Sequence, residues 1–262
     1  MERLKNIKLY LFDMDGTLYL GQQLYDFTKE LLRNIRDSGK KYLFVTNNSS
    51  KSVNDYIKKL KDMGIAAQYE DFVTSSQATA YYLSQHHRQD KLFVCGTKSL
   101  KAELSQAGFT ITEEPDQVDC IVMGFDTELT FRKLETVSKL LCTREIPYIA
   151  TNGDYVCPTE FGSVPDCGSV CDMLFNVSGK RPLVIGKPAT LIPELAMART
   201  GYTAEETAMI GDRLYTDIRC GLNAGILSVL VLSGETTKEM LLASDIKPDV
   251  VLTDASELLQ TM

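Results

Sequence analysis

A chain of 262 residues, of which 44% are hydrophobic, can bury a substantial core as one large domain or two smaller ones. A net charge of −7 opposes binding to a nucleic-acid backbone, and no run reaches the roughly 20 apolar residues of a membrane helix. The seven cysteines are scattered without a Cys-x-x-Cys pair, and the N-terminus carries no visible export signal. We therefore expect a cytoplasmic protein with reduced thiols and with neither nucleic-acid nor membrane partners.

The first part of the chain alternates between apolar, strand-like runs and amphipathic, helix-like stretches. The expected elements are a strand at residues 8–12, a helix ending before Gly39, a strand at 42–45, a helix ending before Gly64 and a strand at 72–74. Ser52 and Asp55 have the spacing of a capping box at the start of the second helix. This alternation is typical of a parallel sheet with crossover helices.

The alternation begins afresh near residue 90. The expected elements there are a strand at residues 92–95, a helix at 99–107, a strand at 120–123, a helix around 131–141, a strand at 148–150 and a loop at 152–168. A helix carrying Ile192 and Leu195 follows, and then strands at 208–210, 226–232 and 250–252. The simplest division is an α/β, Rossmann-like core of residues 1–87 and 182–262, interrupted by an inserted α/β domain of residues 88–181.

Ligands of parallel α/β sheets gather beyond the carboxyl ends of the strands, so polar residues that directly follow apolar runs are candidates for a site. Asp13 and Asp15 follow the first run. Their spacing can place one side chain and one backbone carbonyl on a hard cation, while the other side chain stays free for proton transfer. Taken alone, the pair could also be a solvated turn. A calcium loop is excluded, because Leu18 and Leu24 stand where it needs Gly and Glu.

Two further strand ends and one lysine complete the candidate chemistry. Residues 46–48 offer a hydroxyl and successive backbone N–H groups to an oxyanion, and Asp212 and Asp217 form another acidic strand end. Lys187 is a cation that could serve them. Each feature alone could be a helix cap or a surface charge. Together they provide a nucleophile, a metal site and charge neutralisation, which is what phosphoryl transfer requires.

In this order the motifs resemble those of the haloacid dehalogenase-like phosphatases, and more narrowly the NagD and para-nitrophenylphosphatase group. The resemblance spans nearly the whole chain. It implies a parallel-sheet core with a C2-type α/β cap at residues 88–181. It also implies Mg²⁺-dependent hydrolysis of small phosphate monoesters through an aspartyl-phosphate, the substrate being a sugar phosphate, a nucleotide or a similar metabolite. Para-nitrophenyl phosphate would be the generic substrate.

Two other functions share this fold, a dehalogenase and a non-catalytic protein that binds a phospho-ligand. A dehalogenase needs neither a metal nor a second acid, so Asp15 and Asp212 argue against it. The presence of both Asp13 and Asp15 argues against a decayed, non-catalytic site.

The resemblance implies a role for each motif residue. Asp13 is the nucleophile, and Asp15 is the general acid and base. The implied Mg²⁺ ligands are the side chains of Asp13 and Asp212 and the backbone carbonyl of Asp15, supported from behind by Asp217 and Thr17. The implied phosphate-binding residues are Thr46, Asn47, Asn48 and Lys187. Residues 18–24 would form a flap beside the site.

The loop at residues 152–168 is similar to the specificity loop of the family. Its candidate residues are Asn152, Asp154 and Cys157, although a plain Gly/Pro connection is the alternative. Pyridoxal-phosphate phosphatases carry His where this chain has Cys157, which argues against that substrate. The resemblance also implies a homodimer formed through the cap.

Overall fold

The structure is a computed structural model that describes residues 2–159 and 161–261 and separates by its contacts into two compact units. The first unit comprises Met1–Thr46, Ile57–Val73 and Lys187–Met262, and the second comprises Asn47–Tyr56 and Thr74–Gly186. The chain therefore passes from one unit to the other after residues 46, 56, 73 and 186. The predicted phosphate-binding residues Thr46, Asn47 and Lys187 stand at the first and the last of these places in the sequence. The division of the chain at residues 88 and 181 stays a prediction.

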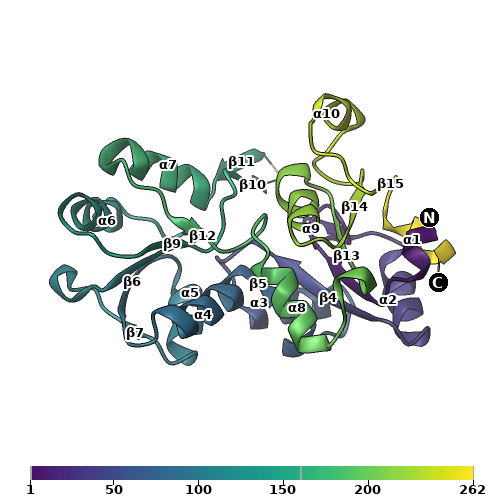
Figure 1. The fold of residues 1–262 in the computed structure, drawn as a ribbon, viewed down its shortest axis with the longest axis horizontal. Helices are drawn as coiled ribbons and strands as arrows, with labels where there is room; N and C mark the ends of the chain where they lie inside the picture. Colours follow the sequence, from purple (N-terminus) through teal and green to yellow (C-terminus); the bar gives the residue numbers. More distant parts are fainter. Residues whose placement is uncertain (1, 160, 262) are drawn as a thin grey trace. The chain divides into compact units, whose positions relative to one another are not determined.

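The first unit is built on a sheet of six strands in the order β15-β14-β13-β1-β4-β5 (Figure 1). The strands are β1 (Leu9–Phe12), β4 (Lys41–Thr46), β5 (Phe72–Thr74), β13 (Thr207–Gly211), β14 (Leu227–Val231) and β15 (Val250–Leu252). The helices are α1 (Glu2–Lys5), α2 (Thr28–Asp37), α8 (Leu191–Thr200), α9 (Arg219–Asn223) and α10 (Lys238–Ala243), while α3 (Val53–Asp62) runs across the boundary between the units. A short antiparallel hairpin joins β2 (Tyr19–Leu20) to β3 (Gln23–Leu24).

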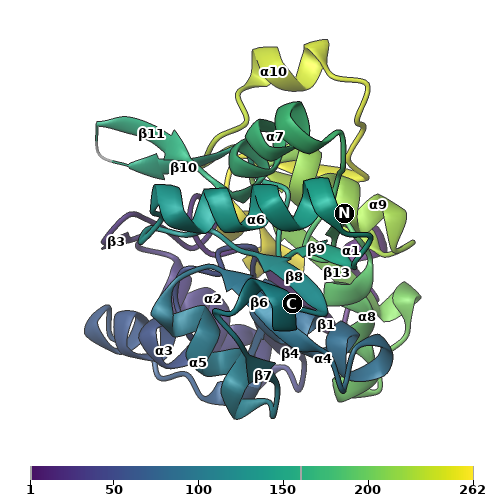
Figure 2. The same cartoon turned by 90° about the vertical axis from the view of Figure 1, so that its left-hand side faces the viewer.

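The second unit has its own sheet of five parallel strands in the order β12-β9-β8-β6-β7. The strands are β6 (Lys91–Cys95), β7 (Thr110–Ile111), β8 (Cys120–Met123), β9 (Tyr148–Ala150) and β12 (Leu183–Val184), with an antiparallel hairpin of β10 (Val156–Thr159) and β11 (Gly162–Pro165). The helices are α4 (Ser75–His86), α5 (Lys98–Gln106), α6 (Phe131–Thr143) and α7 (Cys167–Ser178). In Figures 1 and 2, α6 and α7 lie together on one face of this sheet and α5 lies on the other.

The central strands of the first unit are apolar because both of their faces are covered. Every residue of β1, β13 and β14 is buried, which is the pattern of a parallel sheet with helices on its two sides. The register pairs Phe12 with Ile210 on one side and with Phe44 on the other. The residues that follow β1 and β13 and the last residue of β4 therefore lie next to one another at one edge of the sheet.

The predicted α/β fold with parallel sheets is confirmed, and so is the capping box. Ser52 N–H donates to Oδ2 of Asp55 at 2.8 Å, and Asp55 N–H donates to Oγ of Ser52 at 3.3 Å. The helices α1, α4, α7 and α10 were not expected from the sequence. The region expected to be an irregular loop at residues 152–168 contains the β10–β11 hairpin and the start of α7.

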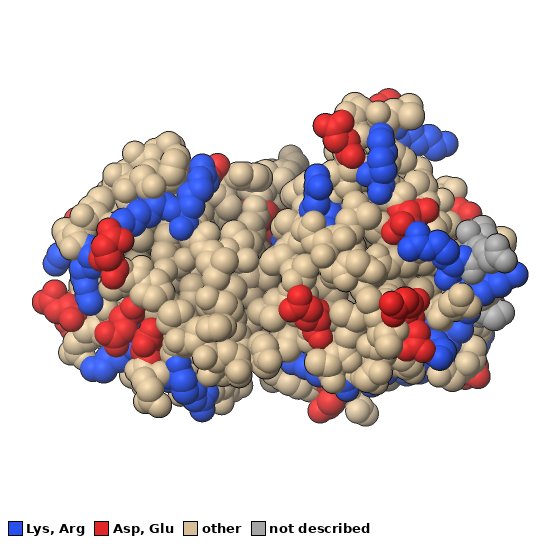
Figure 3. Space-filling model, in the orientation of Figure 1, with Lys and Arg blue, Asp and Glu red and all other residues tan. Residues whose placement is uncertain are grey.

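The surface matches the mixed composition of the chain. Acidic and basic side chains are interspersed over the face that Figure 3 shows. Among residues 2–159 and 161–261, every helix is too short or too polar to traverse a lipid bilayer.

Candidate active site

Three strand ends of the first unit carry the predicted motif residues. Asp13 directly follows β1, Asp212 directly follows β13, and Thr46 is the last residue of β4. Asp13 N–H donates to the carbonyl oxygen of Ile210 at 2.8 Å, which extends the pairing of β1 with β13 by one residue. The sheet thus brings the aspartates together because their strands are neighbours, although 199 positions separate them in the sequence.

Lys187 links two of the aspartates in the interior of the first unit. Its Nζ donates to Oδ1 of Asp13 and to Oδ1 of Asp217, each at 2.6 Å, and only 2% of its side chain is exposed. Burial alone would lower the pKa of Lys187, but the two carboxylates raise it well above the usual range. The ammonium group therefore stays charged, and it neutralises part of the carboxylate charge.

Two aspartates of the site, Asp13 and Asp212, have raised pKa values. Burial raises the pKa of Asp13 to about 8, although the charge of Lys187 lowers it. Burial and the neighbouring Asp217 raise the pKa of Asp212 to about 7. One ammonium group thus faces more negative charge than it can balance, and a further cation would favour the ionised forms.

The same residues fit a divalent cation. Asp13, Asp212 and Asp217 each offer an oxygen, and these three atoms all lie within 4.8 Å of one another. Oδ1 of Asp212 is buried without a hydrogen-bond partner among the described residues. The two oxygens of Asp217 accept from Lys187 Nζ and from Arg213 N–H, which suits a residue behind the ligands. Carboxylate oxygens are the donors that Mg²⁺ prefers.

A loop that follows β14 holds Asp212 in place. Glu235 N–H donates to Oδ2 of Asp212 at 2.7 Å, and Thr236 N–H donates to its carbonyl oxygen at 3.2 Å. Between these two contacts and the strand, the backbone of Gly234 lies so close that a methyl group there would overlap Oδ2 of Asp212. The loop therefore occupies one carboxylate oxygen and leaves the other, Oδ1, for a ligand.

Two further contacts connect this loop to the site. None of the contacts of the loop was predicted from the sequence. Ser233 Oγ donates to the carbonyl oxygen of Gly16 at 2.7 Å, and Nε of Arg213 lies 2.9 Å from Oε2 of Glu235. The signal was present in the sequence, because Ser-Gly-Glu directly follows the apolar run at residues 226–232. The same rule that selected Asp13 and Asp212 would have selected this segment.

Asp15 and Thr17 lie on the loop between β1 and the β2–β3 hairpin. The side chain of Asp15 is exposed, and its Oδ1 accepts a weak hydrogen bond from Gly21 N–H at 3.3 Å. Thr17 is fully buried, and its hydroxyl has no hydrogen-bond partner among the described residues. The predicted flap at residues 18–24 coincides with the hairpin.

The remaining predicted residues belong to the second unit. Asn47 Nδ2 donates to Oδ2 of Asp154 at 2.7 Å, and Asn152 Nδ2 donates to the same oxygen at 3.0 Å. Oδ1 of Asn48 accepts from Ser50 N–H at 2.9 Å. Cys157 lies partly exposed on β10.

Comparisons with known proteins agree with the motifs. The family described as haloacid dehalogenase-like hydrolase matches residues 10–110, and the family described as HAD-hydrolase-like matches residues 184–258. The chain is 36% identical over 254 residues to the 5'-nucleotidase YutF of Bacillus subtilis, which covers 97% of this chain and 98% of that protein. It is 35% identical over 245 residues to the acid sugar phosphatase of Staphylococcus haemolyticus, covering 94% and 92%.

The fold is also similar to that of a solved structure. The crystal structure of 4-nitrophenylphosphatase from Thermotoga maritima superposes with a TM-score of 0.94 at 38% identity and covers 98% of both chains. The chain belongs to the haloacid dehalogenase-like hydrolases, in the NagD and 4-nitrophenylphosphatase group. The predicted family is confirmed, and the relatives confirm the predicted enzyme class, a phosphatase.

Proposed function

We propose that the protein is a Mg²⁺-dependent phosphatase that hydrolyses small phosphate monoesters through a phosphoryl group carried on Asp13. The observation that supports this most directly is the pairing of Lys187 with Asp13 and Asp217, beside a buried oxygen of Asp212 that has no partner among the described residues. One cluster thus contains a nucleophile, Asp13, the positive charge of Lys187, and a carboxylate oxygen of Asp212 that can bind a metal ion.

The residues of the chain divide the reaction between them. A carboxylate oxygen of Asp13 attacks phosphorus, the bond from phosphorus to the ester oxygen breaks, and Asp15 gives its proton to the departing alcohol. Asp15 then takes a proton from water, whose oxygen attacks phosphorus, releases inorganic phosphate and restores Asp13. Proton transfer of this kind typically contributes about 10² to 10⁴ in rate. Lys187 stabilises the phosphoryl oxygens and orients Asp13.

Mg²⁺ would be held by the side chains of Asp13 and Asp212 and the backbone carbonyl of Asp15, with Asp217 and Thr17 behind them. When bound, it would offset the negative charge that the phosphoryl group brings to three carboxylates. Thr46, Asn47 and Asn48 would contribute hydroxyl and backbone N–H groups to the phosphoryl oxygens.

An assay with para-nitrophenyl phosphate tests this function. We expect turnover that requires Mg²⁺ and is abolished by Asp13→Asn, because an amide cannot form the phosphoryl-enzyme. Asp15→Asn should be severely impaired yet still bind Mg²⁺, since its contact with the ion is a backbone carbonyl, whereas Asp212→Asn should lose Mg²⁺ affinity. Full turnover by Asp13→Asn would contradict the assignment of the nucleophile.

The physiological substrate is a small phosphorylated metabolite, and we propose that residues 88–181 act as the cap that selects it. The relatives named above include a nucleotidase and a sugar phosphatase, which makes nucleotides and sugar phosphates the first compounds to test. Cys157 is a candidate for substrate contact because it is partly exposed on β10. A screen of both substrate classes with Cys157→Ser would show whether this residue affects their ranking.

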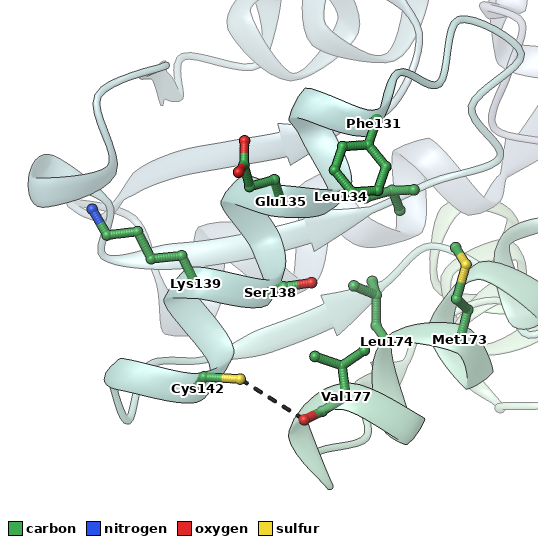
Figure 4. Close-up of a pocket in the computed structure, with 9 residues that line it drawn as sticks. All are labelled: Phe131, Leu134, Glu135, Ser138, Lys139, Cys142, Met173, Leu174 and Val177. Atoms are coloured by element: carbon green, nitrogen blue, oxygen red, sulfur yellow. Dashed lines mark hydrogen bonds between the residues drawn. The ribbon is translucent and has the colours of Figure 1, made fainter.

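A homodimer formed through the cap is also proposed. A groove of about 500 Å³ between α6 and α7 is lined largely by apolar side chains, and 79% of Phe131 is exposed (Figure 4). Glu135 and Lys139 lie along the same edge of this groove, one helical turn apart. A two-fold axis across α6 would place Glu135 of each copy against Lys139 of the other, and would cover the apolar residues.

Light scattering tests this dimer. Glu135→Lys should make the protein monomeric, because like charges would then face each other, and the double change Glu135→Lys with Lys139→Glu should restore the dimer. A wild-type monomer at micromolar concentration would contradict the proposal. A cytoplasmic location is proposed as well, because five buried cysteines, Cys95, Cys120, Cys167, Cys171 and Cys220, form no disulfide, and reducing compartments keep thiols in this state.

A further inference from the structure

We infer that Asp154 is a positioning residue for the phosphate-binding segment at residues 46–48, and that it acts by anchoring the side-chain amide of Asn47. The inference rests on the proposed function and deepens it, because it gives the second unit a part in holding that segment. Its basis is the hydrogen bond of 2.7 Å from Asn47 Nδ2 to Oδ2 of Asp154, two residues that are 107 positions apart.

Asp154 is buried in a network of amide groups. Only 3% of its surface is exposed, and its Oδ2 also accepts from Asn152 Nδ2 at 3.0 Å. Asn152 is fully buried and donates in addition to Oδ1 of Asp166 at 3.1 Å. Hydrogen bonds to a carboxylate are shorter and roughly twice as strong as those between neutral groups, so the network holds its members in one geometry.

The backbone around Asp154 is fixed independently of Asn47. Gly168 N–H, in the first turn of α7, donates to the carbonyl oxygen of Asp154 at 2.8 Å. The two segments pack so closely that a methyl group on Gly168 would overlap the carbonyl oxygen of Gly153. Asp154 is therefore attached to helix α7 of the second unit, and it can impose a position on Asn47.

The segment that carries Asn47 is held at several points within the same unit. Ser75 Oγ donates to the carbonyl oxygen of Asn47 at 2.7 Å. Ser49 Oγ accepts from Phe125 N–H at 2.9 Å and from Thr151 Oγ1 at 2.8 Å. The side-chain amide of Asn47 serves this network, so the group that Asn47 offers to phosphate is its backbone N–H. Donors fixed before the ligand arrives need no reorganisation to stabilise a phosphoryl oxygen.

Inhibition of aryl-phosphate hydrolysis by inorganic phosphate tests this role. Asp154→Ala removes the carboxylate oxygen that the buried amides of Asn47 and Asn152 share, and we expect the Ki for phosphate to rise about tenfold or more. Asp154→Asn keeps an acceptor oxygen without the charge, so its effect should be smaller. The matched control is Asp126→Asn, which changes another buried carboxylate of the same unit, one that pairs with Lys133 at 2.6 Å. It should lower the melting temperature and leave the Ki unchanged.

A double-mutant cycle separates positioning from general destabilisation. If Asp154 acts through Asn47, then Asn47→Ala combined with Asp154→Ala should raise the Ki no further than the more damaging single change. The same cycle with Asp154→Asn applies should Asp154→Ala not fold. A wild-type Ki in Asp154→Ala, or multiplicative effects in the cycle, would overturn the positioning role while wild-type turnover stood. A wild-type chain without Mg²⁺-dependent turnover would overturn the proposed function, and this inference with it.

Discussion

Both units bury aspartates beyond the ends of parallel strands, but they compensate the charge by different means. In the first unit, the ammonium group of Lys187 lies between Asp13 and Asp217. In the second unit, Asp154 accepts from the amides of Asn47 and Asn152, which carry no charge. An ammonium group cancels charge outright, whereas an amide only solvates it.

The difference indicates what each region is suited to do. The first cluster keeps a buried oxygen of Asp212 without a partner among the described residues, so it can still take up a cation. The amide network of the second unit uses its acceptors internally, which makes it suited to holding a backbone in place. Four substitutions would break or sharpen this contrast, and they follow in order of decreasing effect.

Removing the ammonium group should have the largest effect. Lys187→Met leaves Asp13 and Asp217 buried beside each other, and breaking a buried ion pair typically costs about 3–5 kcal/mol. We expect a loss of this size in the free energy of unfolding, measured by urea denaturation with EDTA at neutral pH. Adding Asp217→Asn removes one of the uncompensated charges and should recover part of the loss. Equal stability of the single and double variants would show that the pair does not carry the cost.

A third way to bury a carboxyl group is to keep its proton. Burial raises the pKa of Glu103, on α5 of the second unit, to about 7, although the polar groups of Ser76 and Val53 lower it. The folded state therefore holds this proton over a range in which the unfolded state has lost it. This proton contributes about 3 kcal/mol at most to the free energy of unfolding. The contribution is fully present below about pH 4.5 and is lost as the pH rises through 7.

The variant Glu103→Gln isolates this contribution from the other titrating groups. Denaturation curves between pH 4 and 8 should show a shallower fall in stability with pH than in the wild type. At pH 8 the variant should be the more stable protein, because Gln needs no proton to be neutral. Parallel pH profiles for the two proteins would contradict the pKa shift.

Gly234→Ala tests the loop that holds Asp212. The added methyl group would overlap Oδ2 of Asp212, so either the loop or the carboxylate must move. Changes to residues that orient metal ligands typically cost 10- to 100-fold in affinity, and we expect about that loss for Mg²⁺ by titration calorimetry. The same substitution at Gly153, in the second unit, meets only the side chain of Val184 at 3.5 Å and should leave Mg²⁺ affinity unchanged. Equal affinities in both variants would show that the loop does not position the ligand.

Sequence patterns predicted the core elements well wherever burial followed a helical or strand period. The helix α2 buries Leu31, Leu32 and Ile35 on one face, and that period is visible in the sequence. In α4 the buried residues are mostly small or polar, among them Ser75, Ser76 and Thr79, so no apolar stripe marks the helix. The β10–β11 hairpin was not predicted, because its strands are exposed or half-buried and contain Pro and Gly.

The sequence predicted which residues form the site, but it did not predict which contacts they make. The rule that ligands gather at strand ends selected Asp13 and Asp212, and the structure places their carboxylates together. No sequence pattern indicates that Asn47 would contact Asp154, because nothing local relates two loops 107 positions apart. Partners of this kind depend on how the strands are ordered in the sheet, which periodicity does not reveal.

The smallest effect is expected where a carboxylate stays on the surface. Asp55 is exposed at the start of α3, where partial burial raises its pKa but hydrogen bonds from Ser52 and Ser99 lower it below the usual value. Ser52→Ala removes the hydroxyl of the capping box while water still solvates Asp55, so we expect a loss of only about 1 kcal/mol in urea denaturation. A loss as large as that of Lys187→Met would contradict this expectation. It would show that an exposed carboxylate depends on its hydrogen-bond partner as strongly as a buried carboxylate does.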